Sequence, residues 1–156
     1  MSAPTVSPVP YLLDTNVVLF ATRQNSPADA AIEQQFALKA SPFRPAICEV
    51  TVAELLAFAE SWGTARRKVL DEVIGEMLVL PIGRPEIHAQ WAKLKSYAKG
   101  NGLAIQQDHN DIWIAATAKV AGLTVISSDA AAFLPLRDRG QLAVEVIDPK
   151  TGQRLP

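Results

Sequence analysis

Short apolar runs alternate along the chain with longer segments of helical periodicity, and this alternation restricts the fold more than any other feature. The runs cover residues 11–13, 45–50, 77–82 and 123–128, and a more alternating run covers 142–148. Apolar spacing predicts helices over 27–40, 51–60, 64–77, 85–99 and 109–121. Strands that are apolar throughout are typical of parallel sheets covered on both faces. We therefore expect a single α/β domain whose mainly parallel central sheet has about five strands flanked by helices, with the last run at a sheet edge.

The size and composition indicate how many domains the chain forms and where in the cell it is found. The chain has 156 residues, of which 49% are apolar and 20% charged, enough for one domain with a real core. We expect a lead over 1–9, the domain over 10–148 and a tail over 149–156. No stretch reaches the roughly 18 apolar residues of a membrane span, and the first ten residues do not resemble a signal peptide. A cytoplasmic protein without membrane contact is expected.

The charge balance and the single cysteine narrow the classes of function. Fifteen Lys and Arg stand against 16 Asp and Glu, which disfavours binding of nucleic acid by blanket phosphate neutralisation but leaves room for divalent cations. Cys48 alone cannot form a disulfide or a multi-thiolate metal site within one chain, and its apolar neighbours predict burial. Nor does a Gly-rich phosphate loop follow any strand.

Acidic residues follow several of the predicted strands. Asp14 ends the first strand, Glu54 follows the second and Asp129 the fourth, while Asp111 opens the helix at 109–121. Each could simply be part of a helix cap, since acids favour the first turn. In that alternative, Thr51 and Glu54 form a capping box, Asp108 caps a helix with Asp111 at its third position, and Asp129 caps the segment "AAAF".

Considered together, the acids predict a metal site. The carboxyl ends of parallel strands lie along one edge of a sheet, so these four side chains should converge there. Converging carboxylates raise one another's pKa unless a cation lies between them. Ligation by oxygen alone suits Mg²⁺ or Mn²⁺, and such a cluster can support metal-assisted cleavage of phosphodiesters.

Other polar and aromatic residues have simpler interpretations. His88 and His109 lie in no ligand-spaced motif and are expected at the surface or at helix ends. The basic cluster 66–68 is most simply a solvated helix face, though it could touch a phosphate chain. The three tryptophans fit core or interface positions better than a base-stacking platform; they are Trp62, Trp91 and Trp113.

At the four acids the chain resembles the PIN-domain ribonucleases, most closely the VapC-type toxins of toxin–antitoxin pairs. The matching segments are "LLDTNVVL" (12–19), "EVTVAELLAF" (49–58), "NDIWIAATAKVAGLTVISSD" (110–129) and "AAF" (131–133). They occur in the family's order and spacing, and the resemblance spans roughly residues 10 to 148.

The resemblance implies a role for each matching residue. Asp14, Glu54 and Asp111 match the acidic core of the metal site, and Asp129 matches a fourth, more variable acid. Asn16 and Ser127 match supporting polar positions, with Ser127 standing where Thr is commoner. Asp108 is a rival to Asp111 and Glu49 a rival to Glu54, although the registers of "DIWIAATA" and "TVAELL" favour Asp111 and Glu54.

The function expected from this resemblance is that of a Mg²⁺- or Mn²⁺-dependent endoribonuclease, the toxin of a type II toxin–antitoxin system. It implies an RNA substrate, a small cognate antitoxin and a homodimer. A PIN nuclease of RNA maturation and a non-catalytic PIN-like binding scaffold are alternatives. A phosphatase of the haloacid dehalogenase type is disfavoured, because it needs a second acid two residues after the first, where this chain has Asn16.

Overall fold

The computed structural model describes residues 10–156; the predicted lead over 1–9 lies outside the described residues. Within them, the centre of the molecule is a five-stranded sheet in the order β3-β2-β1-β4-β5, and every neighbouring pair is parallel. The strands are β1 (Tyr11–Leu13), β2 (Ala46–Cys48), β3 (Leu78–Leu80), β4 (Thr124–Ser127) and β5 (Val144–Val146). The predicted α/β fold is therefore confirmed, and the last strand lies at an edge as expected.

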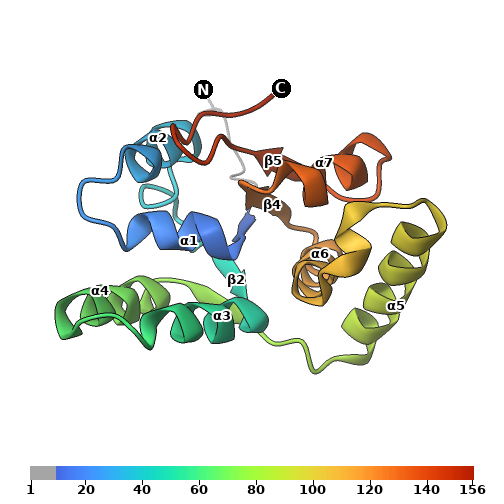
Figure 1. The fold of residues 1–156 in the computed structure, drawn as a ribbon, viewed down its shortest axis with the longest axis horizontal. Helices are drawn as coiled ribbons and strands as arrows, with labels where there is room; N and C mark the ends of the chain where they lie inside the picture. The colour runs from blue at the N-terminus through green and yellow to red at the C-terminus, as the bar shows by residue number, and fades with distance from the viewer. Residues whose placement is uncertain (1–9) are drawn as a thin grey trace, which may run out of the picture.

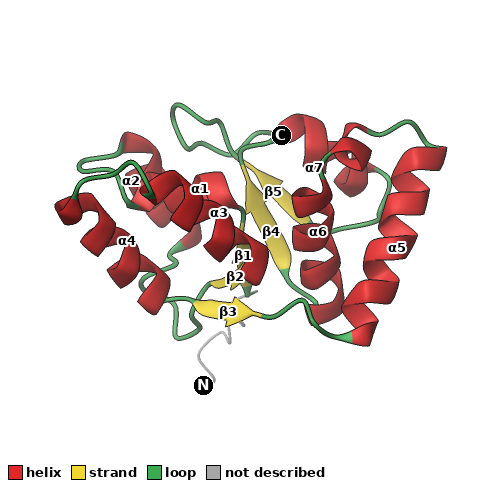
Figure 2. Ribbon diagram, turned by 60° about the horizontal axis from the view of Figure 1, so that its bottom comes forward, coloured by secondary structure: helices red, strands yellow, loops and turns green. Residues whose placement is uncertain are grey.

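Helices cover both faces of this sheet (Figure 1, Figure 2). One group comprises α1 (Thr15–Ala21), α2 (Pro27–Phe36), α3 (Glu49–Ala59) and α4 (Thr64–Gly75). The other comprises α5 (Pro85–Gly100), the 3₁₀ helix η1 (Ala104–Gln107), α6 (His109–Ala121) and α7 (Ala130–Asp138). None of the helices within residues 10–156 is both long and apolar enough to cross a bilayer.

The strands divide their side chains between two apolar cores. Leu12 and Val125 belong to the core under α5, α6 and α7, whereas Leu13 and Ile126 belong to the core under α1 to α4. All four are at most 2% exposed. This is the strand alternation that side chains pointing to opposite faces produce, and it explains why successive positions of β1 and β4 are both apolar and buried. Cys48 is buried, as predicted.

Several predicted element boundaries were wrong by a few residues, and one of them bears on the site. The second strand ends at Cys48 and α3 begins at Glu49, so Thr51 lies inside the helix and the predicted capping box does not form. The helix predicted over 27–40 ends at Phe36, because Ala37 takes a left-handed backbone conformation with φ of 51°. Helix α6 has the predicted bounds of 109–121.

Residues 149–156 fold back onto α2. The side-chain amide of Gln35 donates to the carbonyl oxygen of Gly152 at 2.7 Å, and the Gln35 oxygen accepts from the Arg154 backbone N–H at 2.8 Å. The Arg154 guanidinium lies 4.6 Å from the centre of the Phe36 ring. These contacts hold the end of the described chain beside the first core helices.

Candidate active site

Asp14 lies between β1 and α1 and serves two structural purposes. One carboxylate oxygen, Oδ1, accepts the backbone N–H of Thr15 at 2.8 Å, which makes Asp14 the N-cap of α1. The other oxygen, Oδ2, accepts the Ser127 hydroxyl at 2.7 Å from the end of β4. Asp14 is 4% exposed. Asp14 can therefore cap α1 and also belong to an acidic site, so the two interpretations do not exclude each other.

Ser127 joins the ends of two neighbouring strands. Its hydroxyl donates to Asp14 and accepts the backbone N–H of Asp129 at 2.9 Å, and the side chain is fully buried. Asp129 in turn caps α7 by accepting the Ala132 N–H at 3.0 Å. Ser127 therefore orients the Asp14 carboxylate and the turn that carries Asp129, while its supporting role in a metal site stays a prediction.

Glu54 is held by a threonine that the sequence reasoning missed. The Thr15 hydroxyl lies 2.8 Å from Glu54 Oε1, to which it donates, and 3.3 Å from the hydroxyl of Thr51. Both threonines are buried, while Glu54 is half-buried in the second turn of α3. Thr15 directly follows Asp14, and Thr51 precedes Glu54 by three residues on the same helix face. That spacing could have indicated both.

Asp111 is buried at the start of α6, 9% exposed, in the third helical position. Its backbone N–H donates to Asp108 Oδ1 at 3.1 Å, so Asp108 is the N-cap of α6. Within residues 10–156 the Asp111 carboxylate has no hydrogen-bond partner. Desolvation, followed by repulsion from Asp14, Asp108, Asp129 and Glu54, raises the pKa of Asp111 to about 8.

Asp14 shows the same electrostatic pressure in weaker form. Burial raises its pKa to about 6, although the hydrogen bonds from Ser127 and Thr15 act in the opposite direction. Repulsion from Glu54 and Asp129 adds to the rise. The pKa of Asp111 is thus raised by all three other predicted acids, and that of Asp14 by Glu54 and Asp129. The four carboxylates form one electrostatic cluster at the carboxyl ends of β1, β2 and β4.

This cluster is not a finished ligand cage. Within residues 10–156, no three Asp, Glu, His or Cys side chains are already arranged to hold one metal ion. Mg²⁺ is commonly held by one or two carboxylates together with waters and substrate phosphates, so an open arrangement suits it. The buried Asp111 carboxylate, unpaired within the described chain and crowded by like charge, is the oxygen donor that a cation would stabilise most.

The remaining predicted positions are exposed and lie outside the cluster of four acids. Asn16 is exposed, and its side chain makes no hydrogen bond within residues 10–156, so its supporting role stays a prediction. Glu49 is exposed at the first position of α3. Asp108 is exposed and caps α6, yet its charge contributes to the raised pKa of Asp111. His109 is exposed at the first position of α6, as expected of a helix-end histidine.

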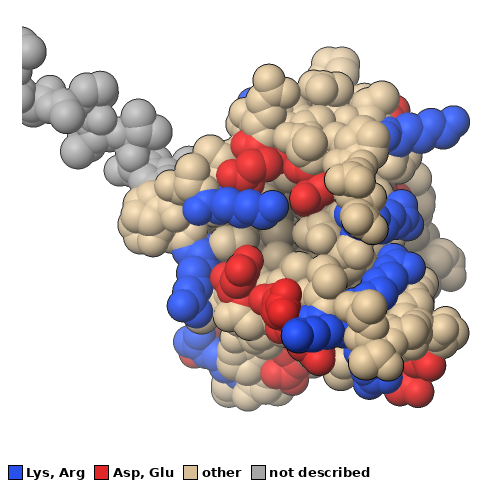
Figure 3. All heavy atoms as spheres, turned by 90° about the vertical axis from the view of Figure 1, so that its left-hand side faces the viewer, with Lys and Arg blue, Asp and Glu red and all other residues tan. Residues whose placement is uncertain are grey.

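A separate apolar hollow lies between α1, α2 and α4. Its volume is about 440 Å³, and Figure 3 shows acidic side chains on both sides of the hollow near the centre of that face. The lining is mainly apolar and includes Val17, Ile32 and Met77. Charged residues lie at its rim; they are Asp29, Glu33, Lys39, Arg44 and Glu76.

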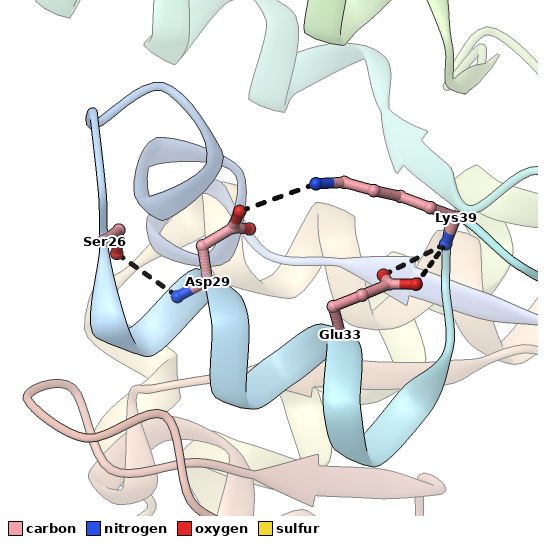
Figure 4. Close-up of polar contacts among 4 residues, drawn as sticks. All are labelled: Ser26, Asp29, Glu33 and Lys39. Atoms are coloured by element: carbon pink, nitrogen blue, oxygen red, sulfur yellow. Dashed lines mark hydrogen bonds and ion pairs between the residues drawn. The ribbon is translucent and has the colours of Figure 1, made fainter.

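Lys39 bridges two acids at the rim of this hollow (Figure 4). Its ammonium group lies 3.7 Å from Asp29 Oδ2, and its backbone N–H donates to both carboxylate oxygens of Glu33 at 3.0 Å. Ser26 caps α2 by accepting the Asp29 N–H at 3.2 Å. The rim is therefore organised by the first helical turn of α2 and by the residues that follow its end.

The comparisons with known proteins agree with this architecture. The profile of the PIN domain matches residues 11–134. Ribonuclease VapC5 of Mycobacterium tuberculosis is 32% identical over 129 residues, which cover 80% of this chain and 87% of that protein. The crystal structure of FitAcB from Neisseria gonorrhoeae is 31% identical with a TM-score of 0.66, covering 86% of this chain and 95% of that one.

A third similar structure is VapBC-5 from Mycobacterium tuberculosis, described as a member of the VapBC family of toxin–antitoxin systems. It has a TM-score of 0.63 at 29% identity and covers 90% of this chain and 98% of that chain. The profile match spans all four predicted acids and both supporting residues. With this match over most of its length, the chain belongs to the PIN-domain family.

Proposed function

We propose that this protein is a Mg²⁺- or Mn²⁺-dependent endoribonuclease that acts as the toxin of a type II toxin–antitoxin pair. The observation that carries the proposal is Asp111, a side chain only 9% exposed whose carboxylate lacks a hydrogen-bond partner within residues 10–156 and is repelled by four neighbouring acids. Such a group is costly in a protein without a cation. The similarity to a ribonuclease of the VapC type supports RNA as the substrate.

The residues of the site have complementary tasks in this proposal. Asp14 and Asp111 would hold the cation, with Glu54 and Asp129 bordering it directly or through water. When bound, the metal supplies an activated water for attack on the phosphorus and stabilises the charge that develops on the phosphate. Ser127 keeps Asp14 oriented from one side and Thr15 keeps Glu54 oriented from the other. The hydroxyls of Ser127 and Thr15 both donate to these carboxylates, so neither is free to serve as a nucleophile.

The proposed partners are a cognate antitoxin and a second copy of the chain. The similarity to VapBC-5, a toxin–antitoxin assembly, supports the antitoxin. Its basic or polar segment would meet the acidic cluster, where four carboxylates attract Arg or Lys. The hollow between α1, α2 and α4 offers room for apolar side chains of the same partner. Homodimerisation is implied by the family resemblance, and Leu78 on the edge strand β3, 54% exposed, offers apolar surface for it.

The test is cleavage of single-stranded RNA by the purified protein. We expect cleavage with Mg²⁺ or Mn²⁺, none in EDTA, and loss of cleavage in Asp111→Asn, which keeps the shape of the side chain and the backbone bond to Asp108. Asp129→Asn should be milder, because that carboxylate already caps α7. A folded Asp111→Asn protein with full activity would refute the assignment and favour a non-catalytic scaffold.

A further inference from the structure

In the basic cluster 66–68 at the start of α4, Arg67 and Lys68 are exposed, as expected of a solvated helix face, whereas Arg66 is half-buried. The Arg66 guanidinium lies 3.7 Å from the centre of the Trp62 ring, and its Nη2 donates to the Thr22 hydroxyl at 3.4 Å. Its Nε is buried and has no hydrogen-bond partner within residues 10–156. The buried Nε cannot reach a ligand, but an arginine presents five N–H donors, and only Nη2 has a partner within residues 10–156, so donors on the two Nη atoms are left for one.

Arg66 borders a hollow whose lining, within residues 10–156, contains no acidic residue. The hollow lies between the end of α1 and the start of α4, and its volume is about 590 Å³. Its lining residues are Ala21, Thr22, Arg23, Gln24, Ala65, Arg66 and Val69. Neither arginine forms an ion pair with another residue in the part of the chain that the structure describes. Basic side chains run down the right-hand part of the face in Figure 3, the view toward these helix ends.

Helices α1 and α3 connect this hollow to the acidic cluster. They lie side by side and both lead away from the carboxyl edge of the sheet (Figure 1). Thr15, the first residue of α1, bonds Glu54 in the second turn of α3, and Thr22, which follows α1, accepts from Arg66 in the first turn of α4. The distance from Asp14 to Thr22 is about 12 Å along the axis of α1. On α3, Phe58 follows Glu54 by one turn and is 50% exposed, which places an aromatic face along the same route.

We propose that Arg66 and Arg23 form a phosphate-binding site for the single-stranded RNA substrate, outside the metal site. A cation among the acids compensates the phosphate that reacts, whereas the flanking phosphates of the same strand are still repelled by the carboxylates. Arg66 and Arg23 have no acidic partner in the described chain, so their guanidinium groups supply the missing positive charge. Seen from the acidic cluster, they lie farther away than Phe58. Guanidinium groups bind phosphate with paired N–H donors, and exposed aromatic rings stack bases with little sequence preference.

An acidic segment of a protein partner could also bind arginines, but the RNA assignment has more support. The hollow lined by Arg23 and Arg66 is connected to the acidic cluster by the packed helices α1 and α3. The exposed Phe58 on α3 can stack on a base, whereas a carboxylate gains little from an aromatic face. Single-stranded nucleic acid is typically bound by such a combination of a positive groove and aromatic side chains. This inference rests on the proposed function for its substrate, and its test does not depend on cleavage.

The experiment measures binding of a fluorescein-labelled 12-nucleotide single-stranded RNA by fluorescence anisotropy in EDTA, over a range of salt concentrations. We expect Arg66→Gln and Arg23→Gln each to bind about tenfold more weakly, equivalent to about 1.4 kcal/mol. The slope of log K against log salt should fall by about 0.7 for each phosphate that a variant no longer neutralises. Arg67→Gln is the matched control, since Arg67 is the exposed neighbour on α4 that does not line the hollow; it should bind within about twofold of the wild type.

Further variants protect the test from trivial explanations. Arg66→Lys retains the charge and should recover part of the affinity, and Arg23→Gln changes an exposed side chain, so its folding should be unaffected. Phe58→Ala should weaken binding, whereas Leu56→Ala, also exposed on α3, should not. Folding of every variant is checked by thermal melting.

The outcomes separate the inference from the proposed function. If Arg66→Gln and Arg23→Gln bind RNA like the wild type, or if the wild type binds none, the phosphate site is refuted. If these variants keep RNA binding but escape a cognate antitoxin, the hollow binds an acidic peptide and the inference is also wrong. A wild type that binds RNA through these arginines but does not cleave it with Mn²⁺ would refute the proposed nuclease function alone.

Discussion

The hydroxyl of Thr15 donates to Glu54 Oε1 at 2.8 Å, across 39 positions of the sequence. This bond ties the first residue of α1, next to the capping Asp14, to the second turn of α3. The orientation of Glu54 is therefore set by a different helix from the one that carries it. Thr15 is a positioning residue in the proposed mechanism, and this assignment leads to the first prediction.

Thr15→Val should weaken the site while Thr15→Ser should not. Valine keeps the shape of the side chain but removes the donor, so Glu54 loses its bond and its fixed orientation. We expect metal-dependent RNA cleavage to fall about tenfold in Thr15→Val, corresponding to about 1.4 kcal/mol in transition-state stabilisation. The increase in melting temperature caused by Mn²⁺ should shrink as well. Equal activity and equal Mn²⁺ response in all three proteins would show that Thr15 only packs.

Mn²⁺ should stabilise the wild-type protein against heat. A ligand that binds only the folded form adds RT ln(1 + [L]/Kd) to the free energy of unfolding, about 2.7 kcal/mol at a hundredfold excess over Kd. Asp111→Asn should keep or gain stability in EDTA, because it removes a repelled carboxylate that has no hydrogen-bond partner within residues 10–156. The variant should also lose the Mn²⁺ response. Calorimetric melts of both proteins, in EDTA and in Mn²⁺, measure these effects.

Asp14→Ala supplies the contrast for this experiment. It removes the cap of α1 and the partner of the Ser127 hydroxyl, so it should cost roughly 0.5–2 kcal/mol for the cap alone, with or without metal. If Asp111→Asn is destabilised to the same degree, and if the wild-type melt is indifferent to Mn²⁺, the acids act only as structural residues.

The stability of the metal-free protein should fall between about pH 4 and pH 8. The pKa of Asp14 is raised to about 6 and that of Asp111 to about 8, both from 3.8. The folded state therefore binds protons more tightly than the unfolded chain, and the stabilisation from these two groups is lost as the pH rises through their folded pKa values. Melting temperatures in EDTA at pH 5 and pH 8 should differ less for Asp111→Asn than for the wild type. An unchanged pH dependence in that variant would contradict the raised pKa.

Metal affinity should show the opposite trend with pH. A cation binds the ionised carboxylates, so protons compete with it until the pH exceeds the raised pKa values. We expect the apparent Kd for Mn²⁺, measured by isothermal titration calorimetry, to tighten as the pH is raised toward 8. A Kd that is constant over this range would place the bound metal away from Asp14 and Asp111.

The cognate antitoxin should bind more weakly when the acidic cluster is neutralised. If a basic segment meets these carboxylates, Asp111→Asn and Glu54→Gln should each raise the Kd of the complex about tenfold, or 1.4 kcal/mol, with a weaker salt dependence than the wild type. Glu145→Gln on β5, outside the cluster, is the control. A complex that leaves the acids exposed and still prevents cleavage would point to inhibition at another surface.

Gly152→Ala should destabilise the fold by about 1–3 kcal/mol. Gly152 has φ of 73°, and an added Cβ would lie 2.4 Å from the carbonyl oxygen and 2.9 Å from the Cα of Ala28 in α2. Gly140→Ala is the matched control, because its φ is 68° but the space around it is open. Chemical denaturation of both variants separates the clash from the backbone penalty. Equal losses would mean that residues 149–156 move aside at little cost.

The local features of this protein were determined by the sequence. Apolar runs of three to six residues predicted the strands, although the edge strand β3 is largely exposed, and the bounds of α6 followed from the acids at its start and Gly122 at its end, where φ is 70°. Strand ends carrying Asp14 and Asp129, and the buried Cys48, could be predicted for the same reason: burial and capping depend on nearest neighbours along the chain.

The convergence of the four acids could be expected from the sequence, but only the tertiary structure decided which hydrogen-bond partners hold them. Thr15 reaches Glu54, and Ser127 reaches Asp14 across 113 positions, because β1 lies between β2 and β4 in the sheet. The sequence pattern allowed Thr51 to be a cap of a helix predicted over 51–60. In the structure β2 ends at Cys48 and α3 begins at Glu49, two residues before the predicted start. The pKa of Asp111 likewise depends on burial and on charges brought together from four separate segments. Contacts across a sheet and electrostatic effects on a pKa both depend on distances in space. The order of residues along a chain does not specify those distances.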